Sequence, residues 1–284
     1  MHLQCGRHAL ILDAPLVMGV LNVTPDSFSD GGRFLQPTQA IAHAQALVAE
    51  GASIVDVGGE STRPGAQSVL LEEELRRIIP VVERLSAMLP VPVSVDTRKP
   101  DVMRRAIAAG ASMINDVAAL SSPGAIEAVA GTDVAVCLVH MQGDPRTMQN
   151  EPRYGDVVGE VRDFLRARVA ACIDAGIERR RLVVDPGFGF GKTLEHNLEL
   201  LRGLPSIAED GLPVLAGLSR KRMIGALTGR GEGERLAGSL ALAVIAAMNG
   251  ARLLRAHDVR ETVDALRIVA AAGAACAPGR GDPA

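Results

Sequence analysis

The chain has 284 residues, 48% of them hydrophobic, and a formal net charge of −3 with acidic and basic residues interspersed. This balance argues against nucleic acid or an anionic membrane as the main partner. No run of about 18 uncharged apolar residues appears, and the first residues lack the pattern of a cleaved signal, so we expect a soluble, cytoplasmic protein. The four cysteines (Cys5, Cys137, Cys172 and Cys276) are widely scattered, which is typical of buried thiols in a reducing compartment; disulfides or a zinc site are the alternative.

The first predicted element is a hairpin within LQCGRHALIL that turns at Gly6-Arg7. We expect it to close the N-terminal end of a barrel, because eight short apolar runs then alternate with eight helical patterns along the chain. Each run ends in a polar residue, and these last residues are Asn22, Thr62, Asp96, Asn115, His140, Asp185, Ser219 and His257. The helical patterns cover 38–50, 72–89, 100–109, 123–130, 156–176, 194–202, 234–248 and 258–272.

Strict alternation of strands and helices predicts a parallel sheet, and eight such units predict a (β/α)₈ TIM barrel. A strand buried on both faces tolerates a polar residue best at its end, so the eight polar residues are expected around one rim of the barrel. A doubly wound open sheet is the alternative, but it would concentrate polar strand ends at one switch point. We expect a single domain over 1–284, with a core of about 14–275 and a disordered tail over 277–284.

The helix predicted over 234–248 has no charged residue after Arg235. A helix in the outer ring of a barrel normally turns a polar face to water. We therefore expect another copy of the chain to cover this helix, which makes the protein a homo-oligomer.

Three loops that follow predicted strands are long and rich in Gly, Pro or polar residues: 22–34, 58–68 and 141–155. Loops of this kind on a rigid barrel commonly carry substrate groups and lids. We assign the first two to the site and interpret 141–155 as a surface excursion. The segment GFGFGKT (187–193) is not a nucleotide phosphate loop, because Pro186 stands where that motif needs its first glycine.

Cationic residues follow the last two strands, in SRKR (219–222) and RAHD (255–258), where barrels commonly bind phosphate groups. Asp96, Asn115 and Asp185 suit the ring N–H, amine and carbonyl groups of a heterocycle such as a pterin or a purine. A structural network with the rim's Lys and Arg residues is the alternative. The His, Asp and Glu residues form no full metal site, so a bound Mg²⁺ would take further ligands from a phosphorylated substrate.

Seven segments in this order resemble the dihydropteroate synthase family of pterin-binding barrels, and the resemblance spans roughly 14–259. They are MGVLNVTPDSFSDGG, DVGGESTRPGA, SVDTRKP, MINDV, VDPGFGFGK, LSRK and RAHDV. The resemblance implies a Mg²⁺-assisted transferase of folate and tetrahydrofolate biosynthesis. It would join (7,8-dihydropterin-6-yl)methyl diphosphate to 4-aminobenzoate, be a sulfonamide target and be dimeric, as the family usually is.

The resemblance also implies a role for each matching residue. Those expected to bind the pterin are Asp96, Asn115, Asp185, Lys221 and Arg255. Those expected at the diphosphate are Asn22, Arg63, Arg255 and His257, with Asn22 also on the metal. Those expected at 4-aminobenzoate are Phe28, Thr62, Arg63, Pro64, Phe190, Ser219 and Lys221. The expected catalytic set is Arg63, Asp96, Lys221, Arg255 and His257.

Two other functions share this barrel. A methyltetrahydrofolate-dependent methyltransferase would use the same pterin edge, but it has no use for the STRPGA loop or for a diphosphate pocket. A non-catalytic paralogue is the second alternative, and the retention of Asn22, Arg63, Lys221 and His257 argues against it.

Overall fold

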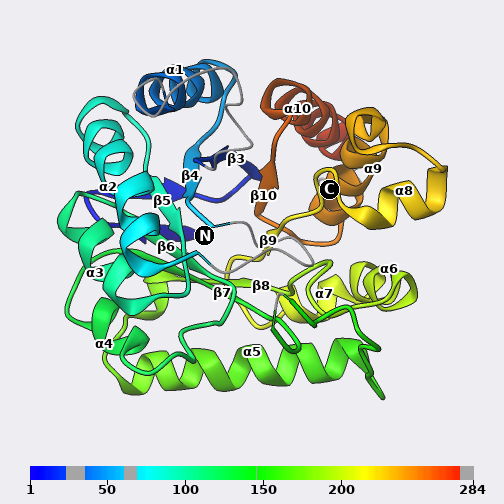
Figure 1. Ribbon diagram of the computed structural model, residues 1–284. Coiled ribbons are helices and arrows are strands. Elements are labelled where there is room, and N and C mark those ends of the chain that lie inside the picture. Colours follow the sequence, from blue (N-terminus) through cyan, green and yellow to red (C-terminus); the bar gives the residue numbers. More distant parts are fainter. Residues whose placement is uncertain (24–35, 61–68, 145, 276–284) are drawn as a thin grey trace, which may run out of the picture.

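The computed structural model describes residues 1–23, 36–60, 69–144 and 146–275. Within them the chain forms an α/β barrel whose parallel strands lie inside a ring of helices (Figure 1). The strands are β3 (Leu16–Asn22), β4 (Ile54–Gly58), β5 (Val93–Asp96), β6 (Met113–Asp116), β7 (Ala135–Val139), β8 (Leu182–Asp185), β9 (Leu215–Ala216) and β10 (Leu253–Ala256). The helices are α1 (Gln36–Ala49), α2 (Leu71–Met88), α3 (Pro100–Ala108), α4 (Ala125–Ala130), α5 (Val157–Asp174), α6 (Leu194–Arg202), α7 (Leu204–Ala208), α8 (Arg222–Thr228), α9 (Leu236–Met248) and α10 (Val259–Ala275).

The strand order is β8-β7-β6-β5-β4-β3-β10-β9, with every pair parallel. A parallel bridge between Val184 and Val214 joins the two end strands and closes the ring. The predicted TIM barrel is therefore confirmed. Its eight predicted helices are present within a few residues at their ends, whereas the short helices α7 and α8 were not predicted.

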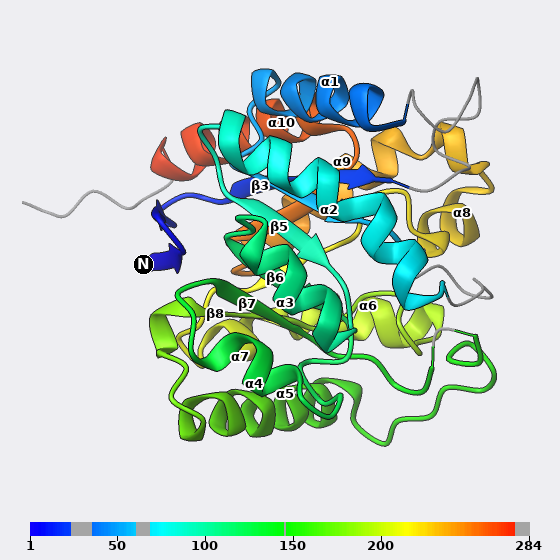
Figure 2. The same cartoon turned by 60° about the vertical axis from the view of Figure 1, so that its left-hand side comes forward.

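The predicted hairpin is also confirmed. Strands β1 (His2–Cys5) and β2 (His8–Ile11) pair antiparallel, and Gly6 takes the left-handed φ of +54° that the turn needs. Leu3 and Cys5 are fully buried against residues from the first positions of the barrel strands. The hairpin thus covers the N-terminal end of the barrel, opposite the arrowheads of the strands (Figure 2).

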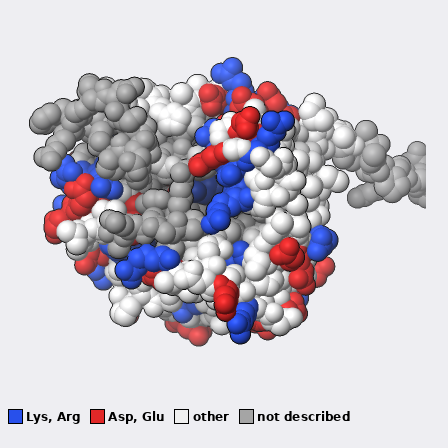
Figure 3. Space-filling model, turned by 45° about the vertical axis from the view of Figure 1, so that its right-hand side comes forward, with Lys and Arg blue, Asp and Glu red and all other residues white. Residues whose placement is uncertain are grey.

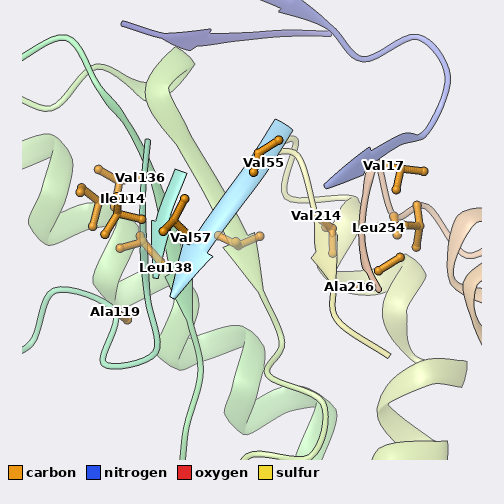
Figure 4. Packing of buried hydrophobic residues seen from close by; sticks show 14 of the residues in the cluster. Val17, Val55, Val57, Ile114, Ala119, Val136, Leu138, Val214, Ala216 and Leu254 are labelled. Carbon is orange, nitrogen blue, oxygen red and sulfur yellow. The ribbon is translucent and has the colours of Figure 1, made fainter. Parts of the chain in front are cut away.

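Alternation along each strand separates two apolar layers. Side chains such as Val55, Ile114 and Leu254 point outward and pack under the helices (Figure 4). Their neighbours, which include Ile54, Met113 and Leu253, point inward and join the hairpin in a second cluster. The half of the barrel interior next to the hairpin is therefore lined by apolar side chains, and the half towards the carboxyl ends of the strands is left for polar groups.

The helix α9 shows apolar side chains on its outer face as well as its inner one. Ser239, Leu242, Ala243, Ala246 and Ala247 are buried against the barrel, yet Leu236, Ile245 and Met248 are exposed, the last by 72%. The adjacent α10 exposes Ile268 by 70%. No helix in the described part of the chain is both long and apolar enough to cross a membrane.

Candidate active site

The polar residues at the strand ends face the inside of the barrel, because each lies two positions after an inward-facing residue. Asp56 follows Ile54, Asn115 follows Met113, Asp185 follows Val183 and Arg255 follows Leu253. The register places Gly58 beside Asp96 and Asp96 beside Asn115. The structure therefore brings together residues that are far apart in the sequence, as was predicted for Asp96, Asn115, Asp185 and Arg255.

A guanidinium lies between two carboxylates at the centre of this layer. Arg255 Nε donates to Asp56 Oδ2 at 2.7 Å, and Arg255 Nη2 donates to Asp96 Oδ2 at 3.1 Å. Asn115 Nδ2 also donates to Asp56 Oδ2, at 3.1 Å. Asp56 is fully buried and fixes the orientation of both Arg255 and Asn115.

The two carboxylates and the amide of this network each keep one oxygen that has no hydrogen-bond partner. Asp56 Oδ1, Asp96 Oδ1 and Asn115 Oδ1 are buried and accept nothing within the described residues. Buried acceptors without donors cost free energy, so their presence together indicates a place built for a ligand that carries N–H groups. Burial raises the pKa of Asp96 to about 7; the Arg255 charge opposes this rise and the Asp56 charge adds to it.

Asp185 ends β8, which lies across the strand ring from β4 and its Asp56. Its Oδ1 accepts from the N–H of Gly187 at 2.7 Å. Burial raises the pKa of Asp185 to about 6, against that hydrogen bond and the nearby charge of Lys221. A buried carboxylate binds a ligand with several N–H donors strongly, because few water molecules have to be removed from it on binding.

The remaining described residues of the predicted site lie around the rim. Lys221 Nζ lies 4.2 Å from the centroid of the Phe190 ring, a cation–π contact between the loops after β9 and β8. Ser219 Oγ lies 3.0 Å from His257 Nδ1 and accepts from the His257 N–H at 3.2 Å. Lys and Arg side chains line a hollow near the centre of the face seen in Figure 3.

Asn22 ends β3 and is half-buried, and its Oδ1 lies near Gly58 on the next strand. The described residues contain no group of three or more His, Cys, Asp or Glu residues that would hold a metal by themselves. Four predicted site residues, Phe28, Thr62, Arg63 and Pro64, lie outside the described residues.

Sequence reasoning missed Asp56 and Lys192. Asp56 is the one charged residue within the apolar run IVDVG of β4, and this position was the signal that could have found it. Lys192 was considered only as part of a phosphate loop, which it is not: its ammonium is buried against His140 and two backbone carbonyls. The segment 141–155, interpreted as a surface excursion, contacts the loop after β8 through Gln149 and Tyr154.

Comparison with known proteins shows the family to which the chain belongs. A sequence model of the family described as "Pterin binding enzyme" matches residues 18–257. The dihydropteroate synthase of Escherichia coli K12 is 55% identical over 263 residues, which cover 93% of each chain.

Two solved structures of the Xanthomonas albilineans dihydropteroate synthase have the same fold. The complex with 4-aminobenzoic acid is 56% identical with a TM-score of 0.91, covering 98% of this chain and 99% of that one. The complex with 7,8-dihydropteroate is 52% identical with a TM-score of 0.88, covering 98% and 100%. The chain therefore belongs to the pterin-binding enzyme family, among the dihydropteroate synthases.

Proposed function

We propose that this protein condenses (7,8-dihydropterin-6-yl)methyl diphosphate with 4-aminobenzoate, giving 7,8-dihydropteroate and diphosphate for folate biosynthesis. The observation that carries this proposal is the set of buried, unpartnered oxygens on Asp56, Asp96 and Asn115 around the Arg255 guanidinium. The pyrimidine side of a pterin offers N–H donors to such acceptors and a flat face to a guanidinium. The relatives named above, one bound to 4-aminobenzoic acid and one to the product, support the assignment.

The pterin subsite comprises Asp96, Asn115, Asp185, Lys221 and Arg255. Asp185 and Asn115 bind the polar edge of the ring, Lys221 donates to its ring acceptors, and Arg255 stacks on its face. Support comes from the burial of the two carboxylates and from the fixed orientation of Asn115 and Arg255. Such a site discriminates strongly against rings that lack the N–H groups, because its acceptors would then stay unpaired.

We assign the diphosphate to the ends of β3 and β10, which carry Asn22, Arg255 and His257, and the resemblance adds Arg63 to this set. Asn22 would hold a Mg²⁺ ion here through its side-chain oxygen, a hard ligand of the kind this ion prefers, and the substrate phosphates and water would supply the other ligands. When bound there, the ion supplies charge neutralisation for the departing diphosphate.

The aminobenzoate subsite includes Phe190, Ser219 and Lys221. The resemblance assigns four further residues to it, which lie outside the described residues: Phe28, Thr62, Arg63 and Pro64. The Phe190 ring gives a wall for the aromatic substrate, and the Lys221 charge beside it suits a carboxylate. Sulfonamides, which resemble 4-aminobenzoate in shape and charge, are expected to compete at this subsite.

The reaction begins when the bond between the pterin methylene carbon and the diphosphate oxygen breaks, and the electron pair leaves with the oxygen. The positive charge left on the methylene is delocalised into the ring, and the Asp96 carboxylate next to Arg255 stabilises it. Arg255 and His257 stabilise the negative charge that develops on diphosphate. The neutral amine of 4-aminobenzoate then attacks the methylene carbon and forms the C–N bond, and one amine proton passes to the released diphosphate.

A coupled assay for diphosphate release tests the proposal. We expect release that depends on both 4-aminobenzoate and the pterin diphosphate, with stoichiometric dihydropteroate. If no diphosphate is released and no methyl group is transferred from methyltetrahydrofolate, the protein is a non-catalytic paralogue. Methyl transfer from methyltetrahydrofolate without diphosphate release would favour the methyltransferase of this barrel type.

We also propose that the protein is a homodimer in the cytoplasm. The exposed apolar residues of α9 and α10 support the dimer, since a second copy of the same face would bury them. Light scattering should give twice the chain mass, and Ile245→Glu should give a monomer; a monomeric parent at micromolar concentration contradicts the dimer.

The three described cysteines are buried free thiols, which suits a reducing compartment, and cell fractionation tests the proposed cytoplasmic location.

A further inference from the structure

The loop that follows β8 encloses a buried cation. Lys192 is 3% exposed, and its Nζ lies 3.0 Å from Gly187 O, 3.1 Å from Phe190 O and 2.9 Å from His140 Nδ1. An ammonium group has three protons, and here it finds three acceptors. The proposed reaction gives this ammonium no role, although it contacts the loop that carries Gly187 and Phe190.

The protonation states fit this arrangement. Burial, together with the Lys192 charge, lowers the pKa of His140 to about 3, so the imidazole is neutral and its Nδ1 can accept. Burial lowers the pKa of Lys192 to about 7, while the Asp185 carboxylate opposes that change and the Lys221 charge adds to it. Only the charged form of Lys192 can donate to all three acceptors at once.

The two residues whose carbonyls bind Lys192 are the same two that shape the substrate subsites. The N–H of Gly187 holds Asp185 Oδ1 at 2.7 Å, and the Phe190 ring lies against Lys221 Nζ. A single buried ammonium therefore connects the carboxylate of the pterin subsite with the aromatic wall of the aminobenzoate subsite.

Close packing admits only glycine at two positions of this loop. A Cβ on Gly187, where φ is +71°, would lie 1.7 Å from His140 O, and one on Gly191 would lie 2.3 Å from Gln142 O. The segment after β7 supports the loop from outside, since Tyr154 Oη donates to Gly191 O at 2.9 Å.

We propose that Lys192 is a positioning residue that sets the pterin and aminobenzoate subsites together, through the carbonyls of Gly187 and Phe190. The inference rests on the proposed function for the identity of the two ligands. It assigns Lys192 no contact with the reacting atoms. Partners that orient binding groups typically change affinity about 10–100-fold when they are removed.

Lys192→Met tests the proposal, because it keeps the length of the side chain and removes the charge and the donors. We expect the Kd for 6-hydroxymethylpterin, measured by calorimetry, and the KM for 4-aminobenzoate each to rise about tenfold. We expect kcat to fall less than about threefold, since the reacting groups stay in place. Tyr154→Phe is the matched control: it releases the other end of the same loop at Gly191, and both constants should stay within about twofold of the parent.

A purely structural role would reduce the folded fraction, which lowers kcat and leaves Kd and KM unchanged; that result overturns the proposal. Equal effects of Lys192→Met and Tyr154→Phe overturn it as well. If Lys192→Met does not fold, His140→Leu removes one of the three acceptors and should raise both constants about threefold, and parent values in that variant count against the proposal. A parent that makes no dihydropteroate defeats the proposed function instead.

Discussion

Removal of the Asp56 carboxylate offers the sharpest test of how the site is held. Asp56→Ala takes away the acceptor of Arg255 Nε and of Asn115 Nδ2, two hydrogen bonds of 2.7 and 3.1 Å to a fully buried group. Hydrogen bonds to charged groups contribute about 1.5–3 kcal/mol each. Relief of the unpartnered Asp56 Oδ1 offsets about 1–3 kcal/mol of that. Arg255 keeps Asp96 and is 22% exposed, so water replaces part of the lost contact. The net loss of unfolding free energy should be about 2 kcal/mol, less than the roughly 3–5 kcal/mol typical of breaking a buried ion pair because of these two offsets.

Urea unfolding measures this loss, and calorimetry with 6-hydroxymethylpterin measures its effect on the site. We expect a lower midpoint at an unchanged slope, together with a pterin affinity that falls at least about tenfold because Arg255 and Asn115 lose their fixed orientation. Ser94→Ala is the matched control, since Ser94 lies opposite Asp56 on β5 and its buried hydroxyl has no partner. It should leave pterin binding near the parent value and should not lower stability, because it removes a buried hydroxyl that has no partner. If Asp56→Ala unfolds at the parent midpoint or binds the pterin with parent affinity, the reasoning about the central network is wrong.

Three further outcomes are expected. Asp185→Ala and Lys221→Ala should each weaken pterin binding about a hundredfold, since each removes a charged hydrogen-bonding group, and unchanged calorimetric affinity in Asp185→Ala contradicts the assignment. His257→Ala should lower kcat about tenfold with pterin affinity retained, as steady-state kinetics and calorimetry can show together. Burial raises the pKa of Asp185 to about 6 and that of Asp96 to about 7, above the value of about 4 in an unfolded chain. The folded protein therefore binds more protons between pH 4 and pH 7, so these groups lower its unfolding free energy as pH rises across that window. Urea unfolding at pH 5 and pH 7 should show a smaller loss in Asp185→Asn than in the parent; equal losses count against the pKa assignment.

The architecture could be predicted because its signals are local and repeated. Apolar runs and helical patterns alternate eight times, and Gly6 marks the turn of the hairpin. The short helices α7 and α8 were missed because neither stands apart in the sequence: α7 begins directly after Gly203, where α6 ends, and α8 begins inside the cationic segment SRKR. The length of β9 could not be predicted either. The run PVLAGLS predicted a full strand, yet only Leu215–Ala216 form one.

The site was predictable where a polar residue ends a strand, as Asp96 and Asp185 do. Asp56 escaped because it lies inside β4, where the sequence gives no sign of the partner that makes a buried carboxylate tolerable. That partner, Arg255, is 199 positions away in the chain and meets Asp56 only through closure of the barrel. Lys192 escaped for a related reason, since two of its three acceptors are backbone carbonyls, which no side-chain pattern reveals.

The division of the barrel interior into an apolar half and a polar half supports the proposal that these residues bind a ligand rather than only each other. A network meant for stability alone would satisfy all its oxygens, because each buried acceptor left unpaired costs about 1–3 kcal/mol. Here Asp56, Asp96 and Asn115 each use one side-chain atom to fix the network and keep an oxygen without a partner. The hairpin and the apolar layer beneath them hold the strands in register, so the cost is borne by the fold and recovered when N–H donors arrive. The same arrangement makes the proposed site selective, since a flat ring without N–H donors would leave the three oxygens without partners and would bind more weakly.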